Sequence, residues 1–337
     1  MAGAQMKAMR FSGVGRPLRL ETVPDPEPGP GWVVVDVEAA GLCHSDLHIM
    51  AGVELGAGLS VSTPLTLGHE GAGVISAVGA GVEDFAVGDR VGVALVVHPV
   101  GEMGFAPGVV CDGAFAERQL VRASALVRIP DGVSFAEAAV ATDSVATAYH
   151  AVRAAGAVQA GERVAIIGLG GLGLNAVHVT VLLGADAYGV DISPAARTAA
   201  KEAGALSCWP DPGALNALAP DVIVDFVGGT ATTTAAVEAV RPGGRVVLVG
   251  LSEETAPVPI ASFVTRNVQL TGSLGASKDE LRQVYDLIAS DAFRPTVAEV
   301  DFHELPVAMD RLARGEVQGR LYTRPRARRG PLSIRAA

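Results

Sequence analysis

The chain has 337 residues, of which 49% are hydrophobic and only 18% are charged, and its formal net charge at pH 7 is −10. The length and the apolar content predict a globular protein of two domains, and the acidic balance argues against nucleic-acid and anionic-membrane partners, since both bind basic faces. Three cysteines, an odd number, do not form a disulfide framework. Because the first residues also lack the pattern of a secretory signal, we expect a cytoplasmic protein.

The first part of the chain has the patterns of short β-strands. Residues 32–38 begin apolar and then alternate as a partly buried strand does, and residues 71–79 and 88–93 are short β-prone runs punctuated by glycines. Such runs are typical of a small barrel with tight turns. From about residue 135 the sequence is rich in alanine, and we expect helix to residue 150 and on to residue 160.

Strands and helices alternate in the second part. Continuous apolar runs bounded by Gly or Asp predict strands at residues 164–167, 187–190, 222–226 and 246–249, and Ala-rich stretches predict helices at residues 194–203 and 232–240. Apolar strands separated by helices indicate a parallel sheet covered on both faces. Near the C-terminus we expect helices at residues 281–289 and 305–314, a short strand at 321–322 and a frayed basic end at 324–335.

The stretch of residues 164–185 carries no charge and is long enough to cross a bilayer. The four glycines at residues 168–173, with Asn175 and His178 after them, fit a strand, a tight turn and a buried helix better. Its flanks also lack the charge asymmetry of a membrane helix. We therefore expect no membrane partner.

A glycine-rich turn follows the first of these strands. Gly168, Gly170 and Gly173 form the pattern G-x-G-x-x-G between a buried strand and a helix. The first glycine permits the tight turn, the second lets backbone approach a pyrophosphate, and the third lets the helix pack against the strand. The phosphates of a dinucleotide would lie at the N-terminus of the helix, beside Gly171 and Leu172, where unpaired N–H groups attract anions.

Asp191 ends the next predicted strand, where an acidic residue would meet the adenosine ribose. Its alternative role is a helix cap, but Ser193 and Pro194 already supply an N-cap and a first-turn proline. We therefore expect Asp191 to be free to accept hydrogen bonds from both ribose hydroxyls. This favours NAD over NADP, because an acid repels a 2′-phosphate. Arg197 is a further cofactor candidate, since it could lean toward a phosphate.

A second group of candidate residues follows the first predicted strand. Residues 43–48 read C-H-S-D-L-H, and residues 68–70 read G-H-E. A thiolate and a neutral imidazole are ligands that zinc prefers, and a hydroxyl with a further histidine beside them can move a proton. Ahead of a dinucleotide motif, this combination indicates metal-assisted hydride transfer.

Several motifs together resemble one known family. The segments G-L-C-H-S-D-L-H, G-H-E-G-A-G-V, V-G-D-R-V, G-L-G-G-L-G and G-R-L are similar to those of the zinc-dependent alcohol dehydrogenases of the medium-chain dehydrogenase/reductase superfamily, through nearly the whole chain. The resemblance implies an α/β protein. It has a GroES-like catalytic β-barrel at residues 1–147, completed by residues 275–337, and a Rossmann NAD-binding domain with a doubly wound parallel sheet at residues 148–274.

For the metal, the resemblance implies that Cys43 and His69 are two ligands of one catalytic zinc ion. The usual third ligand is a cysteine, and this chain has Asp143 in its place. Zinc with Cys43, neutral His69 and Asp143 is formally neutral, as with two thiolates and a histidine. Because the neighbours of Asp143 are apolar or small, its carboxylate needs a partner, and we favour a ligand over a helix cap. Glu70 resembles the family's nearby acid, which can approach the metal as an extra ligand.

The resemblance also implies a proton path. Ser45 resembles the relay hydroxyl beside the substrate oxygen, and His48 the base that exchanges the proton with solvent by way of the ribose hydroxyls. Asp46 is expected to orient a metal ligand. His44 matches a basic position near the pyrophosphate, and Arg320 matches a phosphate-contacting arginine.

The chain departs from many relatives in the region of residues 94–113. Where those carry a lobe with four cysteines around a structural zinc, this chain has only Cys111, so no such site can form. Residues 50–64 and 94–113, with Leu251 and Leu274, are expected to line a mostly apolar pocket, and Leu251 also to contact the cofactor. Such a pocket favours a hydrophobic or cyclic alcohol.

The function expected from the sequence is NAD-dependent interconversion of an alcohol with an aldehyde or ketone at one zinc ion. Two alternatives stay open: a zinc-free or metal-indifferent reductase of the same fold acting on an activated C=C or C=N bond, and a non-catalytic dinucleotide-binding protein. Cys43, Ser45, His48 and His69 together favour the zinc enzyme. Proteins with this fold usually pair through the sheet edge of the Rossmann domain, so we expect a homodimer or homotetramer.

Overall fold

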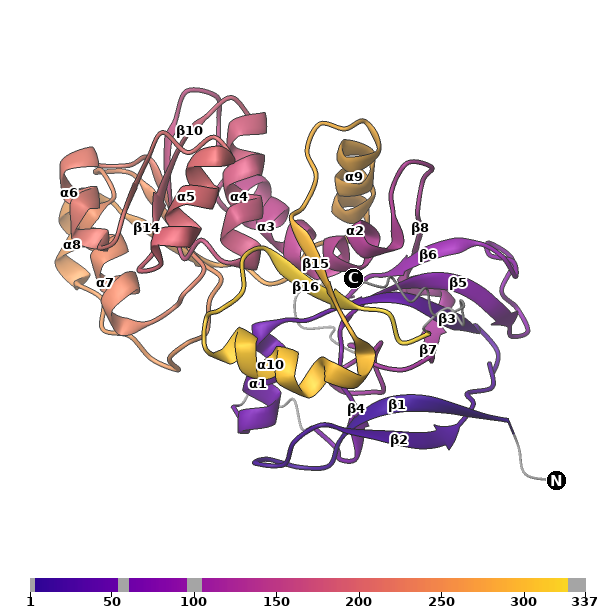
Figure 1. Cartoon of the computed structure of the whole chain (residues 1–337). Coiled ribbons are helices and arrows are strands. Elements are labelled where there is room, and N and C mark those ends of the chain that lie inside the picture. The colour runs from indigo at the N-terminus through magenta and orange to yellow at the C-terminus, as the bar shows by residue number, and fades with distance from the viewer. Residues whose placement is uncertain (1–3, 54–60, 96–104, 327–337) are drawn as a thin grey trace, which may run out of the picture.

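The computed structural model describes residues 4–53, 61–95 and 105–326. Figure 1 shows two parts side by side, a β-rich part and a part in which strands alternate with helices. The first is mostly antiparallel and the second entirely parallel, which confirms the expected α/β class. The expected domain limits, at residues 147/148 and 274/275, stay a prediction.

The β-rich part contains two sheets. The larger has the order β15-β16-β3-β5-β6-β8, with β7 also paired to β3, and the smaller has the order β2-β1-β4. The strand bounds are β1 Gln5–Phe11, β2 Arg19–Pro24, β3 Trp32–Gly41, β4 Leu65–Thr66, β5 Glu70–Val78, β6 Arg90–Val93, β7 Arg118–Arg122, β8 Leu126–Arg128, β15 Val297–Val300 and β16 Arg320–Thr323. The three strands predicted here are present as β3, β5 and β6.

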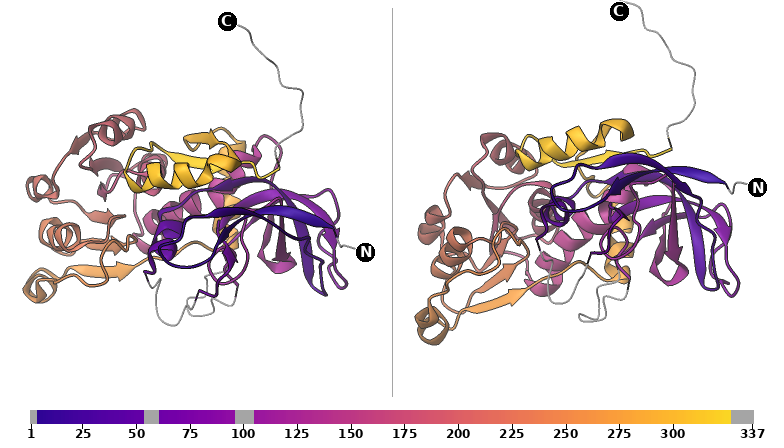
Figure 2. Two further views of the ribbon diagram at one scale, coloured as in Figure 1. Left: turned by 60° about the horizontal axis from the view of Figure 1, so that its bottom comes forward. Right: turned by 90° about the horizontal axis from the view of Figure 1, so that it is seen from below.

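The C-terminal segment returns to this part of the molecule. Strand β16 pairs antiparallel with β3, and α10 (Leu305–Ala313) contacts α1 (His44–Ala51). Both views of Figure 2 show the yellow C-terminal segment lying against the indigo and purple N-terminal part. Leu42, Ile49 and Leu305 belong to one buried cluster at this junction. The return therefore brings Arg320 close to the end of β3, after which Cys43 follows.

The parallel sheet has six strands in the order β11-β10-β9-β12-β13-β14. When these strands are numbered along the chain, the order is the 3-2-1-4-5-6 of a doubly wound sheet. In such sheets the ligand crevice lies at the carboxyl ends of the strands where the order reverses. Here that point lies between β9 and β12. The strand bounds are β9 Arg163–Ile167, β10 Asp186–Val190, β11 Ser207–Trp209, β12 Val222–Asp225, β13 Arg245–Leu248 and β14 Gln269–Gly272.

Helices cover both faces of this sheet. Val164 and Ile166 of β9 pack in the cluster that includes α4, whereas Ala165 and Ile167 pack in the cluster that includes α7. Neither face of β9 is exposed, which explains why its sequence is continuously apolar. The helix bounds are α4 Gly171–Leu182, α5 Pro194–Glu202, α6 Leu215–Leu218, α7 Thr230–Ala239 and α8 Ile260–Arg266. Helix α9 (Lys278–Ala289) contacts β8 of the other part instead.

The helical run after residue 135 links the two parts. It comprises α2 (Phe135–Val140), a π-helical turn (Ala141–Val145), α3 (Ala146–His150) and a second π-helical turn (Ala151–Ala155). The expected extension to residue 160 is wrong, because the helix ends at Gly156. Each π-helical turn widens the helix locally, and such turns are frequent at functional sites. The first of them carries Asp143.

The uncharged stretch of residues 164–185 contains β9, the glycine turn and α4, as predicted. Within the described ranges, no helix combines the length and the apolarity needed to cross a bilayer. Most of the basic end expected at residues 324–335 lies outside the described residues.

Candidate metal and cofactor site

Asp46, in the first turn of α1, joins the two segments that carry the first candidate ligands. Its Oδ2 accepts a hydrogen bond from the Cys43 N–H at 3.0 Å, and its Oδ1 accepts one from the Gly68 N–H at 3.2 Å. Asp46 is fully buried, so its charge needs these donors. The carboxylate thereby fixes Cys43 beside the residue that follows Gly68, His69.

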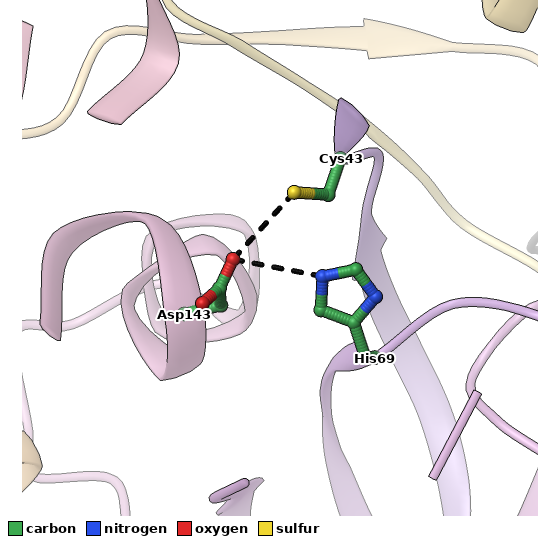
Figure 3. Close-up of side chains that lie close together, drawn as sticks. All are labelled: Cys43, His69 and Asp143. Atoms are coloured by element: carbon green, nitrogen blue, oxygen red, sulfur yellow. Dashed lines mark hydrogen bonds and ion pairs between the residues drawn. The ribbon is translucent and has the colours of Figure 1, made fainter. Parts of the chain in front are cut away.

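Cys43, His69 and Asp143 converge on one point (Figure 3). Oδ2 of Asp143 lies 3.6 Å from Sγ of Cys43 and 3.5 Å from Nε2 of His69. Within the described part of the chain, these residues form a group whose ligand atoms all lie within 4.8 Å of one another. At most 9% of each residue is exposed, so the group is shielded from bulk solvent.

These separations fit a zinc ion. Tetrahedral zinc, with bonds of about 2.3 Å to sulfur and about 2.1 Å to nitrogen and oxygen, holds sulfur and oxygen ligands about 3.6 Å apart and nitrogen and oxygen about 3.4 Å apart. The structure has 3.6 Å between Sγ and Oδ2 and 3.5 Å between Nε2 and Oδ2. Three protein ligands leave a fourth position for a substrate, as in catalytic zinc sites.

The surroundings of His69 favour the tautomer that a metal requires. Its Nδ1 lies 3.3 Å from Oδ1 of Asp46, so a proton on Nδ1 faces a carboxylate and Nε2 is left for the metal. Burial disfavours the charged ring, but the negative charges of Asp46 and Cys43 raise the pKa of His69 well above its usual value. A site this anionic attracts a cation, and a bound metal would displace the second ring proton.

Asp143 is held as a carboxylate. Burial opposes its charge, but hydrogen bonding from His69, the charge of Arg320 and a hydrogen bond from Thr147 keep the pKa of Asp143 well below its usual range. Its Oδ1 accepts the Thr147 hydroxyl at 2.8 Å. Neither the π-helical turn nor α3 receives a side-chain cap, so the alternative role as a helix cap is not seen.

Glu70 and Arg320 form a buried ion pair beside this group. Nη2 of Arg320 donates to Oε1 of Glu70 at 2.6 Å, Nε donates to Oε2 at 3.1 Å, and Nη2 also lies 3.4 Å from Oδ2 of Asp143. Burial raises the pKa of Glu70 to about 7 against the opposing pull of Arg320. Both oxygens of Glu70 are engaged, and Oε1 also accepts the Ser144 N–H at 3.0 Å. Its expected role as an extra metal ligand stays a prediction, and it requires this pair to open.

A cavity of about 380 Å³ joins candidate residues from both parts of the chain. It is lined by Cys43, His44, Ser45, His48, Gly168, Gly170, Gly171, Leu172, Gly173, Asp191, Phe226, Val227, Val249, Gly250, Leu251, Ser252 and Arg320. Oγ of Ser45 lies 3.6 Å from Sγ of Cys43. The proposed relay residues, Cys43 of the metal group and the glycine turn therefore share one space.

The glycine turn has the backbone that its sequence predicts. Gly168 has a φ of +84°, which glycine adopts without strain. A Cβ on Gly173 would lie 1.8 Å from the carbonyl oxygen of Gly168, so only glycine allows this approach of helix to strand. A Cβ on Gly170 would meet nothing within 4 Å, which leaves room for a ligand beside the backbone.

The expectation that Asp191 is free of other hydrogen bonds is wrong. Its Oδ2 accepts the Leu169 N–H at 2.7 Å and its Oδ1 accepts the Ser193 N–H at 2.7 Å, so it holds the glycine turn. Each oxygen keeps a further lone pair for a ligand, and Asp191 lines the cavity. Arg197 donates to the carbonyls of Asp191 and Ile192 at 2.6 and 3.0 Å and does not line the cavity.

The two histidines on the cavity wall favour the neutral form. Burial lowers the pKa of His48. Burial, then the charges of Arg320 and His48, lower the pKa of His44. A neutral imidazole can accept a proton, which is the property that a general base needs.

The sequence reasoning missed three polar residues, of which Ser144 and Asn175 connect the helical run that carries Asp143 to α4. The Ser144 hydroxyl donates to the Gly171 carbonyl at 3.1 Å, and Nδ2 of Asn175 donates to Ser144 Oγ at 3.0 Å and to the same carbonyl at 2.8 Å. The third is Thr147, bonded to Asp143. A polar residue within an apolar helix was the available signal. The residues of the cavity wall that follow β12 (Phe226 and Val227) and β13 (Val249 and Gly250) were missed as well. They could have been found, because ligands of a doubly wound sheet bind at the carboxyl ends of its strands.

The expected substrate-pocket segments are described only in part. Residues 54–60 and 96–104 lie outside the described residues. Leu251 lines the cavity, whereas Leu274 does not. Cys43, Cys111 and Cys208 are all free thiols.

Comparisons with known proteins identify the family. The family model "Alcohol dehydrogenase GroES-like domain" matches residues 29–131, and the model "Zinc-binding dehydrogenase" matches residues 171–290. An alcohol dehydrogenase of Geobacillus stearothermophilus is 33% identical over 340 residues, which covers 94% of this chain and 98% of that relative. The chain belongs to the zinc-binding alcohol dehydrogenase family.

Solved structures agree with membership of the zinc-binding alcohol dehydrogenase family. The alcohol dehydrogenase of Aeropyrum pernix superposes with a TM-score of 0.87 at 30% identity, covering 95% of this chain and 100% of that one. The acetophenone reductase of Geotrichum candidum, solved in complex with NAD, superposes with a TM-score of 0.86 at 28% identity, covering 96% and 98%. The GroES-like and Rossmann parts expected from the resemblance are therefore confirmed.

Proposed function

We propose that this protein is a zinc- and NAD-dependent dehydrogenase that interconverts an alcohol with its aldehyde or ketone. The observation that carries the proposal is the convergence of Cys43, His69 and Asp143 at zinc-ligand separations, next to a cavity that contains the dinucleotide turn. Relatives named alcohol dehydrogenase, and an acetophenone reductase solved with NAD, support the same chemistry.

The mechanism assigns separate roles to residues around the cavity. Cys43, His69 and Asp143 would hold the zinc ion, which when bound supplies Lewis-acid polarisation of the substrate oxygen. Ser45, beside Cys43, would accept the proton of the substrate hydroxyl as it gives up its own hydroxyl proton. That proton would reach His48 by way of the ribose hydroxyls and pass from there to solvent, because burial lowers the pKa of His48 and favours the neutral imidazole that can accept it.

The cofactor would be held by the Rossmann part. The backbone of the glycine turn and the start of α4 bind the pyrophosphate, where unpaired N–H groups and the helix dipole attract anions. Asp191 contributes its remaining lone pairs to the ribose, which favours NAD. His44, Leu251 and Arg320 line the same cavity and complete the contacts. Bound there, NAD would supply the nicotinamide ring that accepts a hydride.

Removing single ligands tests the metal site. Cys43→Ala and His69→Ala are expected to lose zinc and turnover and to keep NAD binding, measured by metal analysis, alcohol-dependent NADH formation and NADH fluorescence titration. Cys111→Ala is the matched control, a free thiol outside the group. An enzyme that stays fully active after complete zinc removal would instead be the metal-indifferent reductase. A protein that binds NAD and turns over none of a panel of alcohols and carbonyls would be the non-catalytic alternative.

The described cavity wall favours an apolar substrate. Phe226, Val227, Val249 and Leu251 contribute apolar surface to it, and the only formally charged side chains that line it are Asp191 and Arg320. We therefore propose a hydrophobic or cyclic alcohol or its ketone. A substrate panel in which charged hydroxy acids give higher kcat/KM than cyclic alcohols would contradict this.

We also propose a homodimer or homotetramer that forms through the edge of the parallel sheet. In the described residues β14 pairs only with β13, so its other edge can accept a strand. Nearby α8 exposes 75% of Ile260 and 78% of Val264. The double variant Ile260→Lys/Val264→Lys should shift the mass from light scattering toward the monomer, and an unchanged mass contradicts the interface.

We propose that the protein works in a reducing compartment, the cytoplasm, which its free thiols support.

A further inference from the structure

We propose that Thr147 is a positioning residue that makes Asp143 bind the metal through one oxygen only. The inference rests on the proposed function, because it concerns the same metal site. Thr147 belongs to none of the sequence motifs, does not line the cavity, and is only 4% exposed. Its effect must therefore pass through Asp143, four residues earlier on the same face of the helix.

The two oxygens of Asp143 have different surroundings. Oδ1 accepts the Thr147 hydroxyl at 2.8 Å. Oδ2 faces Sγ of Cys43 at 3.6 Å, Nε2 of His69 at 3.5 Å and Nη2 of Arg320 at 3.4 Å. The hydroxyl therefore sets the plane of the carboxylate and points Oδ2, and not Oδ1, at the other two ligands.

The hydrogen bond of Thr147 differs from that of another buried helical threonine. Thr180, which is fully buried, donates its hydroxyl to the carbonyl of Ala176 four residues earlier at 2.8 Å. A hydroxyl has one proton to donate, and Thr147 gives it to the side chain of Asp143. Because the acceptor is ionised, this hydrogen bond is of the stronger, charge-assisted kind.

A carboxylate ligand needs such support where a thiolate does not. A cysteine offers one donor atom, whereas a carboxylate offers two and can bind a cation through either or both. Binding through both would add a ligand atom to the metal and would favour harder cations that take more oxygen ligands. By fixing the carboxylate so that Oδ1 faces its hydroxyl and Oδ2 faces the other two ligands, Thr147 leaves three donor atoms from Cys43, His69 and Asp143, and a fourth position stays open.

The test measures metal binding rather than turnover. Thr147→Val should weaken zinc affinity by about tenfold or more, the usual effect of losing a hydrogen bond to a metal ligand. In the cobalt-substituted protein it should weaken the intense visible bands of tetrahedral Co²⁺. Thr147→Ser, which keeps the hydroxyl, should restore both properties. Thr180→Val is the matched control and should change neither.

The same substitution made in the Asp143→Cys variant separates the proposed positioning role of Thr147 from a role in packing alone. In Asp143→Cys the ligand is a thiolate with a single donor atom, so adding Thr147→Val there should leave the zinc affinity within about twofold. An equal loss in both backgrounds, or no loss with Asp143 present, overturns the inference. Full zinc occupancy in Asp143→Ala would instead overturn the proposed metal site itself, and that result is distinguishable from either of these.

Discussion

The buried ion pair between Glu70 and Arg320 allows a quantitative prediction. Arg320→Met removes the N–H donors that serve Glu70, which is 0% exposed, and Asp143, which is 9% exposed. Removing one partner of a buried pair costs about 3–5 kcal/mol, because the other charge is left uncompensated. Adding Glu70→Gln removes that charge and keeps an oxygen for the Ser144 N–H. Both variants lack the Arg320 partner of Asp143, so they differ only at position 70. There the double variant has unmet hydrogen bonds, about 1–3 kcal/mol, in place of an unpaired charge, and it should be about 2 kcal/mol more stable than Arg320→Met.

Urea denaturation followed by tryptophan fluorescence measures this difference. The chain has two tryptophans, Trp32 in β3 and Trp209 in β11, so each part of the molecule carries one reporter. The control is Arg324→Met, whose partner Glu299 lies 3.1 Å away with 52% of its side chain exposed. Such an exposed pair contributes at most about 1 kcal/mol. A double variant no more stable than the single Arg320→Met variant would refute the reasoning.

Three further predictions concern the turn, the cofactor and a thiol. Gly173→Ala should abolish NAD binding in a titration, because the added Cβ would lie 1.8 Å from the carbonyl oxygen of Gly168; retained affinity would contradict the packing argument. Asp191→Ala should raise the KM for NAD by about tenfold or more, since it removes a charged acceptor that also holds the turn; an unchanged KM counts against that role. Burial, followed by the charge of Asp112, raises the pKa of Cys111 to about 11, so its thiolate is scarce at neutral pH. Its alkylation rate, followed by mass spectrometry, should keep rising about tenfold per pH unit up to pH 10, and a plateau near pH 9 would disprove the shift.

The sequence predicted those features that local patterns encode. The apolar runs gave the strands β9, β10, β12 and β13 to within a residue or two, because a sheet covered on both faces needs continuous apolar strands. One cavity is lined by the motif residues Cys43, Ser45 and His48 together with the glycines of the turn, as their chemistry implied. Asp143 was found because the family resemblance implies a third ligand at that position, and its apolar neighbours favoured a ligand over a helix cap.

Features that depend on distant contacts could not be predicted. Glu70 and Arg320 pair across 250 positions, and nothing local to either shows it. Asp191 was expected to be free because its neighbour Ser193 caps α5, yet the turn before α4 also needed an acceptor for the Leu169 N–H. The π-helical turn that carries Asp143 likewise has no evident signal in an Ala-rich run.

The central claim, one catalytic zinc ion held by Cys43, His69 and Asp143, is tested most directly by zinc content measured together with activity. Protein purified without chelator should contain one zinc per chain, since Cys111 alone cannot form a second site in residues 94–113. Dialysis against a chelator should remove the zinc and the alcohol-dependent NADH formation in parallel, and added zinc should restore both. Zinc-free protein with full activity, or Asp143→Ala with full zinc occupancy, would contradict the account.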